Sequence, residues 1–189
     1  VAAQVGAAHV RITDRTAASG GAAALANAAR SVRTNSLGAR CSVSGLDWGS
    51  LDTGARAMLE ADAGVLLGAD CLYTSEAFDD VLATAHWALH HAPAAAPSRE
   101  GGTATDPASS GPPASSVGEN LVECQAPPRR FYTTYQERSA GRSIRALLAK
   151  WRLRAQEIPL DFLPDPDDPK FSSIHLLLIE PLSDLPSGE

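Results

Sequence analysis

The sequence Asp62-Ala-Gly-Val-Leu-Leu-Gly-Ala-Asp-Cys-Leu-Tyr73 contains a short apolar run that ends in a carboxylate and a phenol. The run predicts a strand buried on both faces, as in a parallel sheet, and Gly68 lets another group approach the backbone closely. In open α/β sheets, ligands bind beyond the carboxyl ends of the strands, where Asp70 and Tyr73 would lie. We therefore predict that residues 68–73 form the floor of a site.

The residues before this run predict a βαβ unit. Residues 1–7 are compatible with the last turns of a helix, and residues 9–14 alternate as a strand that stops at Asp14. After Gly20-Gly21, apolar residues recur at helical spacing, namely Leu25, Ala28, Ala29 and Val32. Residues 41–44 predict another strand, and a loop containing Asp47-Trp48-Gly49 follows it.

Beyond Tyr73, the order of elements continues to alternate. A helix is expected from near Ser75, which could cap it, and a second amphipathic helix contains Leu147 and Trp151. Strands are expected at residues 130–135, 156–160 and 172–180. The alternation predicts an α/β fold with a doubly wound, mostly parallel sheet and antiparallel strands at the C-terminal end.

Composition limits the organisation of the chain. With 189 residues and 44% hydrophobic content, it can bury one ordinary core, and no segment is apolar enough to predict a membrane span. Residues 92–129 are rich in Pro, Ala, Ser and Gly and predict a disordered insertion. We therefore expect a single domain whose two parts, residues 1–91 and 130–189, flank that insertion.

Charge and cysteine content narrow the function classes. The net charge of −6 argues against general nucleic-acid affinity, although eight of the 16 Lys and Arg residues fall within residues 129–154. The three cysteines, Cys41, Cys71 and Cys124, lack metal-binding spacing and favour a reducing compartment, cytoplasmic or nuclear. The five histidines are scattered and predict no metal site.

Three strand ends carry candidate functional side chains. Asp14 could accept hydrogen bonds from ribose hydroxyls, or it could be an ordinary turn or helix cap. Trp48 could stack on an adenine, or it could fill the core. Asp70 and Tyr73 could hold an amino group and a substrate nitrogen, or they could be a helix N-terminal acid and a packed aromatic.

Four motifs taken together resemble a known family. They are Val10-Arg-Ile-Thr-Asp14-Arg15, Leu46-Asp-Trp48-Gly49, Gly68-Ala-Asp70-Cys-Leu-Tyr73 and Tyr132-Thr-Thr-Tyr-Gln-Glu-Arg138-Ser139. In order and spacing they look like the seven-strand, S-adenosylmethionine-dependent protein methyltransferases of family 16. Within it, the last motif, with Leu147-Leu-Ala-Lys-Trp151 and Ile158-Pro-Leu160, is most similar to a branch associated with histone arginine methylation and transcriptional regulation.

The resemblance implies a Rossmann-like sheet, S-adenosyl-L-methionine as cofactor and a protein acceptor, either a histone or a chaperone-associated protein. Asp14 would then bind the cofactor ribose, Trp48 would lie against the adenine, and Ala69 would line the pocket through its backbone. Asp70 and Tyr73 match the Asp-x-x-Tyr pattern that lysine-directed members place beside the methyl-transfer centre. Either Lys or Arg is therefore left open as the acceptor side chain.

The sequence departs from the family pattern at its start. The family's first strand and its Glu/Asp-x-Gly-x-Gly cofactor loop are absent, and the chain resembles an N-terminally truncated member that begins in the following helix. Without those backbone contacts, we expect the chain to be inactive or to bind cofactor weakly.

Two other functions compete with protein methylation. The basic residues within 129–154 could dock an acidic partner or nucleic acid, which would make the chain a non-catalytic binding module. The simpler explanation of those charges is the solvated face of a helix. A small-molecule methyltransferase is the third possibility, because no motif encodes the acceptor pocket.

Overall fold

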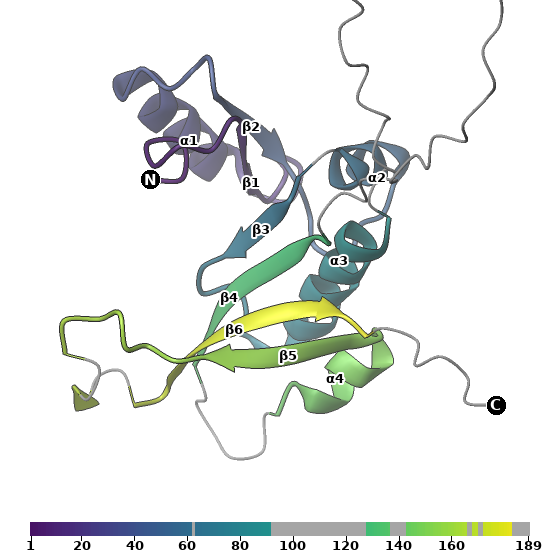
Figure 1. Ribbon diagram of the computed structural model, residues 1–189. Helices are drawn as coiled ribbons and strands as arrows, with labels where there is room; N and C mark the ends of the chain where they lie inside the picture. Colours follow the sequence, from purple (N-terminus) through teal and green to yellow (C-terminus); the bar gives the residue numbers. More distant parts are fainter. Residues whose placement is uncertain (62, 92–127, 137–142, 166–167, 170–171, 183–189) are drawn as a thin grey trace, which may run out of the picture.

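The computed structural model describes residues 1–61, 63–91, 128–136, 143–165, 168–169 and 172–182. Its strands form two sheets, one of two strands and one of four, and helices alternate with the strands along the chain (Figure 1). The predicted α/β class is therefore confirmed. The strands form two sheets with both parallel and antiparallel pairs, where one mostly parallel sheet was predicted.

The two-stranded sheet is the predicted βαβ unit. Strands β1 (Val10–Asp14) and β2 (Cys41–Gly45) run parallel and are connected by helix α1 (Ala22–Thr34). Parallel neighbours need such a crossover, and α1 buries Val32 against the sheet. Residues 1–7 form turns rather than the expected helical end, so the prediction for this segment is wrong.

The four-stranded sheet has the order β3-β4-β6-β5. Strand β3 (Val65–Gly68) pairs parallel with β4 (Arg130–Gln136), whereas β6 (Ile174–Pro181) is antiparallel to β4 and to β5 (Leu153–Ile158). The antiparallel strands thus lie at the C-terminal end of the chain, as predicted.

Helix α3 (Phe78–His90) covers one face of this sheet (Figure 1). Leu82 of the helix and Ile179 of β6 are completely buried at this contact. The helix does not begin at a Ser75 cap as expected. A short 3₁₀ helix, η1 (Ser75–Ala77), precedes it, and no side chain caps either helix.

The expectation that both faces of β3 are buried is wrong. Leu66 packs against the core under α3, but Val65 and Leu67 point to the opposite face and are 56% and 68% exposed. Side chains alternate along a strand, and α3 covers only one face of the sheet. The apolar character of the run therefore reflects two chemically similar faces of which only one is covered within the described residues.

Sequence periodicity missed helix α2 (Thr53–Glu60), which buries no residue. Its signal was the cap: the Asp52 carboxylate accepts a 2.8 Å hydrogen bond from the Ala55 N–H. Without a buried face, the apolar repeat that reveals most helices is weak.

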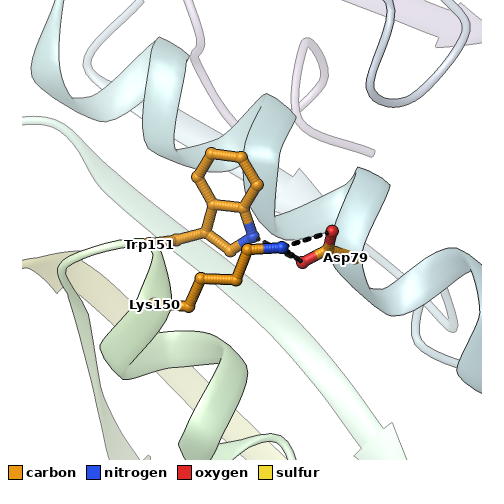
Figure 2. A network of polar contacts seen from close by, with 3 residues as sticks. All are labelled: Asp79, Lys150 and Trp151. Carbon is orange, nitrogen blue, oxygen red and sulfur yellow. Dashed lines mark hydrogen bonds and ion pairs between the residues drawn. The ribbon is translucent and has the colours of Figure 1, made fainter.

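Helix α4 (Arg145–Lys150) is held to α3 by a polar cluster shown in Figure 2. Lys150 Nζ donates to both carboxylate oxygens of Asp79 at 2.8 and 2.7 Å, and Trp151 Nε1 donates to Asp79 Oδ1 at 2.9 Å. The Lys150 and Trp151 hydrogen bonds lower the pKa of Asp79. The carboxylate therefore joins the first turn of α3 to the last turn of α4.

Arg129 is a second polar connection, and it corrects the boundary of the expected insertion. Residues 92–127 lie outside the described residues, but Arg129 is described and is 5% exposed. Its guanidinium donates to the carbonyl oxygens of Leu59, Glu60 and Ala61 at the end of α2 and of Ala88 in α3, at 2.6 to 3.0 Å. Arg129 thus belongs to the folded domain.

Candidate functional site

The carboxyl ends of β1 and β2 meet side by side. Asp14 and Gly45 are paired in register, and the Leu46 N–H donates to the Asp14 carbonyl oxygen at 2.7 Å. The exposed Asp14 carboxylate accepts the Arg15 N–H through Oδ1, at 2.8 Å. Its second oxygen has no donor among the described residues, so it is open to a hydroxyl-bearing ligand.

Asp47 ties the loop after β2 to the loop after β1. Thr16 N–H donates to Asp47 Oδ1 at 2.9 Å, and the hydroxyls of Thr16 and Ser19 each donate to Oδ2 at 2.7 Å. These hydrogen bonds, that of the Thr16 hydroxyl first, lower the pKa of Asp47. The sequence reasoning overlooked Asp47, although an acid and two hydroxyl residues directly after neighbouring strand ends were the available signal.

Trp48 stands between two fixed neighbours. On one side is Asp47, and on the other the Gly49 N–H donates to Thr84 Oγ1 of α3 at 2.9 Å. Gly49 has a φ of +74°, and a Cβ there would lie 2.6 Å from Asp80 Oδ1. The Trp48 side chain is 37% exposed, so the alternative that it is buried in the core is wrong.

The loop after β3 holds Ala69, Asp70 and Tyr73 in exposed positions. Asp70 has a φ of +51°, a conformation that Asp tolerates better than most residues, and its N–H donates to Thr134 Oγ1 of β4 at 3.0 Å. Tyr73 is 44% exposed, so the alternative that it is a packed aromatic is wrong. Both side chains are accessible to a partner.

Gly68 is needed for internal packing. A Cβ at this position would lie 2.9 Å from both Cys71 Sγ and Phe131 Cε2, so the close group is the protein's own core. Cys71 is buried beside Thr133, at 3.2 Å between Sγ and Oγ1, and burial raises the pKa of its thiol. A buried, protonated thiol is a poor nucleophile.

The predicted residues fall into two groups. Asp14 and Trp48 lie on adjoining loops, and Gly49 links those loops to α3, the helix that follows the loop of Asp70 and Tyr73. Asp70 is attached to β4 through Thr134. Among the described residues, no hydrogen bond or ion pair joins Asp70 or Tyr73 directly to Asp14 or Trp48.

A cavity of about 560 Å³ lies between the ends of β1 and β2 and helix α2. Thr16, Asp47 and Asp52 contribute to its wall, as does Arg11, which donates to the Met58 carbonyl oxygen at 2.9 Å. None of the five predicted site residues lines it. The cavity is therefore adjacent to the predicted site and does not contain it.

Several of the basic side chains of residues 129–154 make contacts within the fold. Arg129 is buried, Lys150 binds Asp79, and Arg154 pairs with Glu180 at 3.0 Å. These contacts reduce the charge available to an acidic partner. In the part of the chain that the structure describes, no helix has the length and apolarity that crossing a membrane requires.

Comparison with known proteins agrees with the resemblance in the motifs. No protein-family model matches the chain. The chain is 28% identical to histone-arginine methyltransferase METTL23 of Xenopus laevis over 136 residues, which are 72% of this chain and 42% of that protein. It is 28% identical to the Homo sapiens protein of the same name over 127 residues, 67% of this chain and 48% of that protein.

The protein of that name from Rattus norvegicus is 26% identical over 125 residues, 66% of this chain and 40% of the relative. The matched regions thus span less than half the length of each of these relatives. The chain is distantly similar to the METTL23 histone-arginine methyltransferases of several vertebrates.

Proposed function

We propose that this chain has the cofactor site of an S-adenosylmethionine-dependent protein methyltransferase, with an arginine side chain of a histone as the leading acceptor. The acceptor is taken from the names of the similar proteins. The observation that supports the cofactor is the pairing of Asp14 with Gly45 at one sheet edge, which sets an open carboxylate beside the loop of an exposed Trp48.

These residues fit an adenosyl group chemically. A carboxylate oxygen without a donor can accept hydrogen bonds from ribose hydroxyls, and an indole face can stack on adenine. Ala69, exposed at the next strand end, would line the pocket through its backbone. The cofactor, when bound, supplies an electrophilic methyl group on a sulfonium.

The strand order supports a Rossmann-like sheet that lacks one member. Within the described residues, β1 and β3 each stand at the end of a sheet with one edge unpaired. A parallel strand between them would join both sheets into one of seven strands and would place β1, β2, β3 and β4 in the same orientation. That position is where the family's first strand and glycine-rich loop would lie.

Asp70 and Tyr73 are the proposed acceptor-side residues. The Asp70 carboxylate would hold a cationic guanidinium or ammonium group, and the Tyr73 hydroxyl would fix the nitrogen that attacks the methyl group. In such a displacement the protein contributes alignment, with the reacting atoms ~3 to 3.5 Å apart. A lysine acceptor uses the same two side chains and remains the alternative.

The test measures binding of S-adenosylhomocysteine by the chain and by its Asp14→Asn and Asp70→Asn variants, together with transfer of labelled methyl from S-adenosylmethionine to histone octamers. We expect Asp14→Asn to weaken cofactor binding and Asp70→Asn to reduce transfer with cofactor binding retained. Asp165→Asn, an exposed acid outside these loops, is the matched control. No binding of S-adenosylhomocysteine by the unmodified chain, measured by NMR titration so that weak complexes are detected, would count against the proposal.

A further inference from the structure

Asp47 joins the two loops that carry the side chains proposed to hold the adenosyl group. It immediately precedes Trp48, and the hydrogen-bonded residue Thr16 lies two positions after Asp14. Three donors from the β1 loop converge on this one carboxylate, from Thr16 N–H, Thr16 Oγ1 and Ser19 Oγ. These three hydrogen bonds therefore connect the loop after β1, which follows Asp14, to the loop after β2, which contains Trp48.

The residues on both sides of Trp48 are held by hydrogen bonds, and those of Asp47 hold one side. On the other side, Gly49 is fixed to α3 through Thr84 Oγ1, whose hydroxyl in turn donates to the Asp80 carbonyl oxygen at 2.8 Å. Backbone on both sides of Trp48 is thus anchored to different elements, while its indole remains partly exposed. A rigid aromatic face loses little conformational entropy when it binds a ligand.

Both oxygens of Asp47 are already engaged inside the protein. Oδ1 accepts one hydrogen bond and Oδ2 accepts two, all 2.9 Å or shorter. Charge-assisted bonds of this length are stronger than those between neutral groups. A carboxylate occupied in this way is suited to holding the protein's own loops.

We propose that Asp47 is a positioning residue that holds Trp48 and Asp14 in the arrangement needed to grip an adenosyl group, without itself contacting that group. This inference rests on the proposed function. It assigns to Asp47, with Thr16 and Ser19, an indirect role in ligand affinity, which differs from the direct contacts proposed for Asp14 and Trp48.

The experiment measures binding of S-adenosylhomocysteine and of adenosine to the chain by NMR titration. Adenosine carries only the part that Asp14 and Trp48 would grip. We expect Asp47→Ala to lower the affinity for both ligands by the same factor, about tenfold, because charge-assisted hydrogen bonds are lost. In the Asp47→Ala background, Thr16→Val should weaken binding no further, because its partner is already gone.

Asp52→Ala is the matched control. Asp52 also accepts a backbone N–H at 2.8 Å, five residues further along, but it caps α2, and within the described residues no hydrogen bond joins its side chain to the β1 loop. It should lower stability and leave adenosine affinity unchanged. An equal loss of affinity in Asp52→Ala and Asp47→Ala would show a merely structural effect and overturn the proposal.

A conservative variant separates positioning from direct contact. In Asp47→Asn, the amide oxygen can still accept the Thr16 N–H and the amide nitrogen can donate to the two hydroxyl oxygens. Asp47→Asn should therefore retain most of the adenosine affinity, whereas a direct charged contact would be lost. Ser19→Ala removes a single exposed hydroxyl and should weaken adenosine binding by a smaller factor, about twofold to threefold.

Unchanged affinity in both Asp47→Ala and Ser19→Ala, in a chain that binds adenosine, would overturn this inference and leave the proposed function intact. Failure of the unmodified chain to bind either ligand would instead overturn the proposed function, and this inference with it.

Discussion

The guanidinium of Arg129 donates a 2.7 Å hydrogen bond to the carbonyl oxygen of Ala88, in the last turn of α3. The same group reaches three carbonyl oxygens at the end of α2. The last carbonyls of a helix lack intrahelical partners, and a cation there also complements the helix dipole. One buried side chain therefore caps the C-terminal ends of two helices and connects both of them to the start of β4.

Replacing Arg129 should be the most damaging of the substitutions considered. Arg129→Met would leave the carbonyl groups of both helix ends without their donors, and we expect a loss of about 3–5 kcal/mol in the free energy of unfolding. Urea denaturation followed by circular dichroism measures this. The control is Arg130→Met, because Arg130 is exposed and its ion pair with Glu180 is 3.6 Å long, which predicts a change below about 1 kcal/mol. Similar losses in the two variants would contradict the role assigned to Arg129.

Gly49 and Gly54 should respond to alanine in opposite directions. Gly49 has a φ of +74° and no room toward Asp80, so Gly49→Ala should destabilise the fold by about 1–2 kcal/mol. Gly54 lies in α2 and a Cβ there would be 3.4 Å from Asp52 Oδ1, so Gly54→Ala should stabilise it by about 0.5–1 kcal/mol. Thermal unfolding of both variants shows whether each substitution raises or lowers the stability. A stabilising Gly49→Ala would contradict the fixed backbone conformation described beside Trp48.

Asp79 should make stability depend on pH in the acidic range. Its pKa is lowered by hydrogen bonds from Lys150 and Trp151, so the ionised form is favoured in the folded state. The stabilisation is therefore complete above the unfolded-state pKa, near pH 4, and is lost as the pH falls through the lowered folded-state value. Between about pH 5 and about pH 2, the thermal midpoint of the unmodified chain should fall more than that of the Asp79→Asn variant. Parallel curves for the two proteins would exclude this linkage.

The two faces of β3 should differ in tolerance. Leu66 packs against the core, and Leu66→Ala should cost about 2–4 kcal/mol of unfolding free energy. Leu67 is 68% exposed, and Leu67→Lys should change the free energy of unfolding by less than about 0.5 kcal/mol, which urea denaturation of both variants measures. Destabilisation by Leu67→Lys comparable to that of Leu66→Ala would show that another element covers this face.

The candidate site was predictable as a set of residue types at strand ends. Asp14, Trp48 and Asp70 follow or end strands whose apolar patterns are local, so their exposure at one kind of position could be anticipated. Asp47 could not be singled out in the same way. Its importance depends on Thr16 and Ser19, which are about thirty residues away in sequence and are brought to it by the parallel pairing of β1 and β2.

The helices also differ in how far the sequence predicts them. The amphipathic helices α1 and α3 were predicted because they bury one face, whereas α2 buries no residue and gives no comparable apolar repeat. The burial of Arg129 was also hidden, because a charged residue beside a Pro-rich segment is usually solvated. Only the meeting of two helix ends supplies the carbonyl groups that make its burial favourable.

The sequence by itself determined the alternation of strands and helices, the carboxylates at the strand ends and the distant similarity to the METTL23 proteins, because these depend on local periodicity and on residue identity in order. The tertiary structure alone decided which face of β3 is covered, which loops Asp47 joins and which helix ends Arg129 caps. Those outcomes depend on contacts between residues far apart in the chain, and the energy of such contacts is not encoded in any one segment.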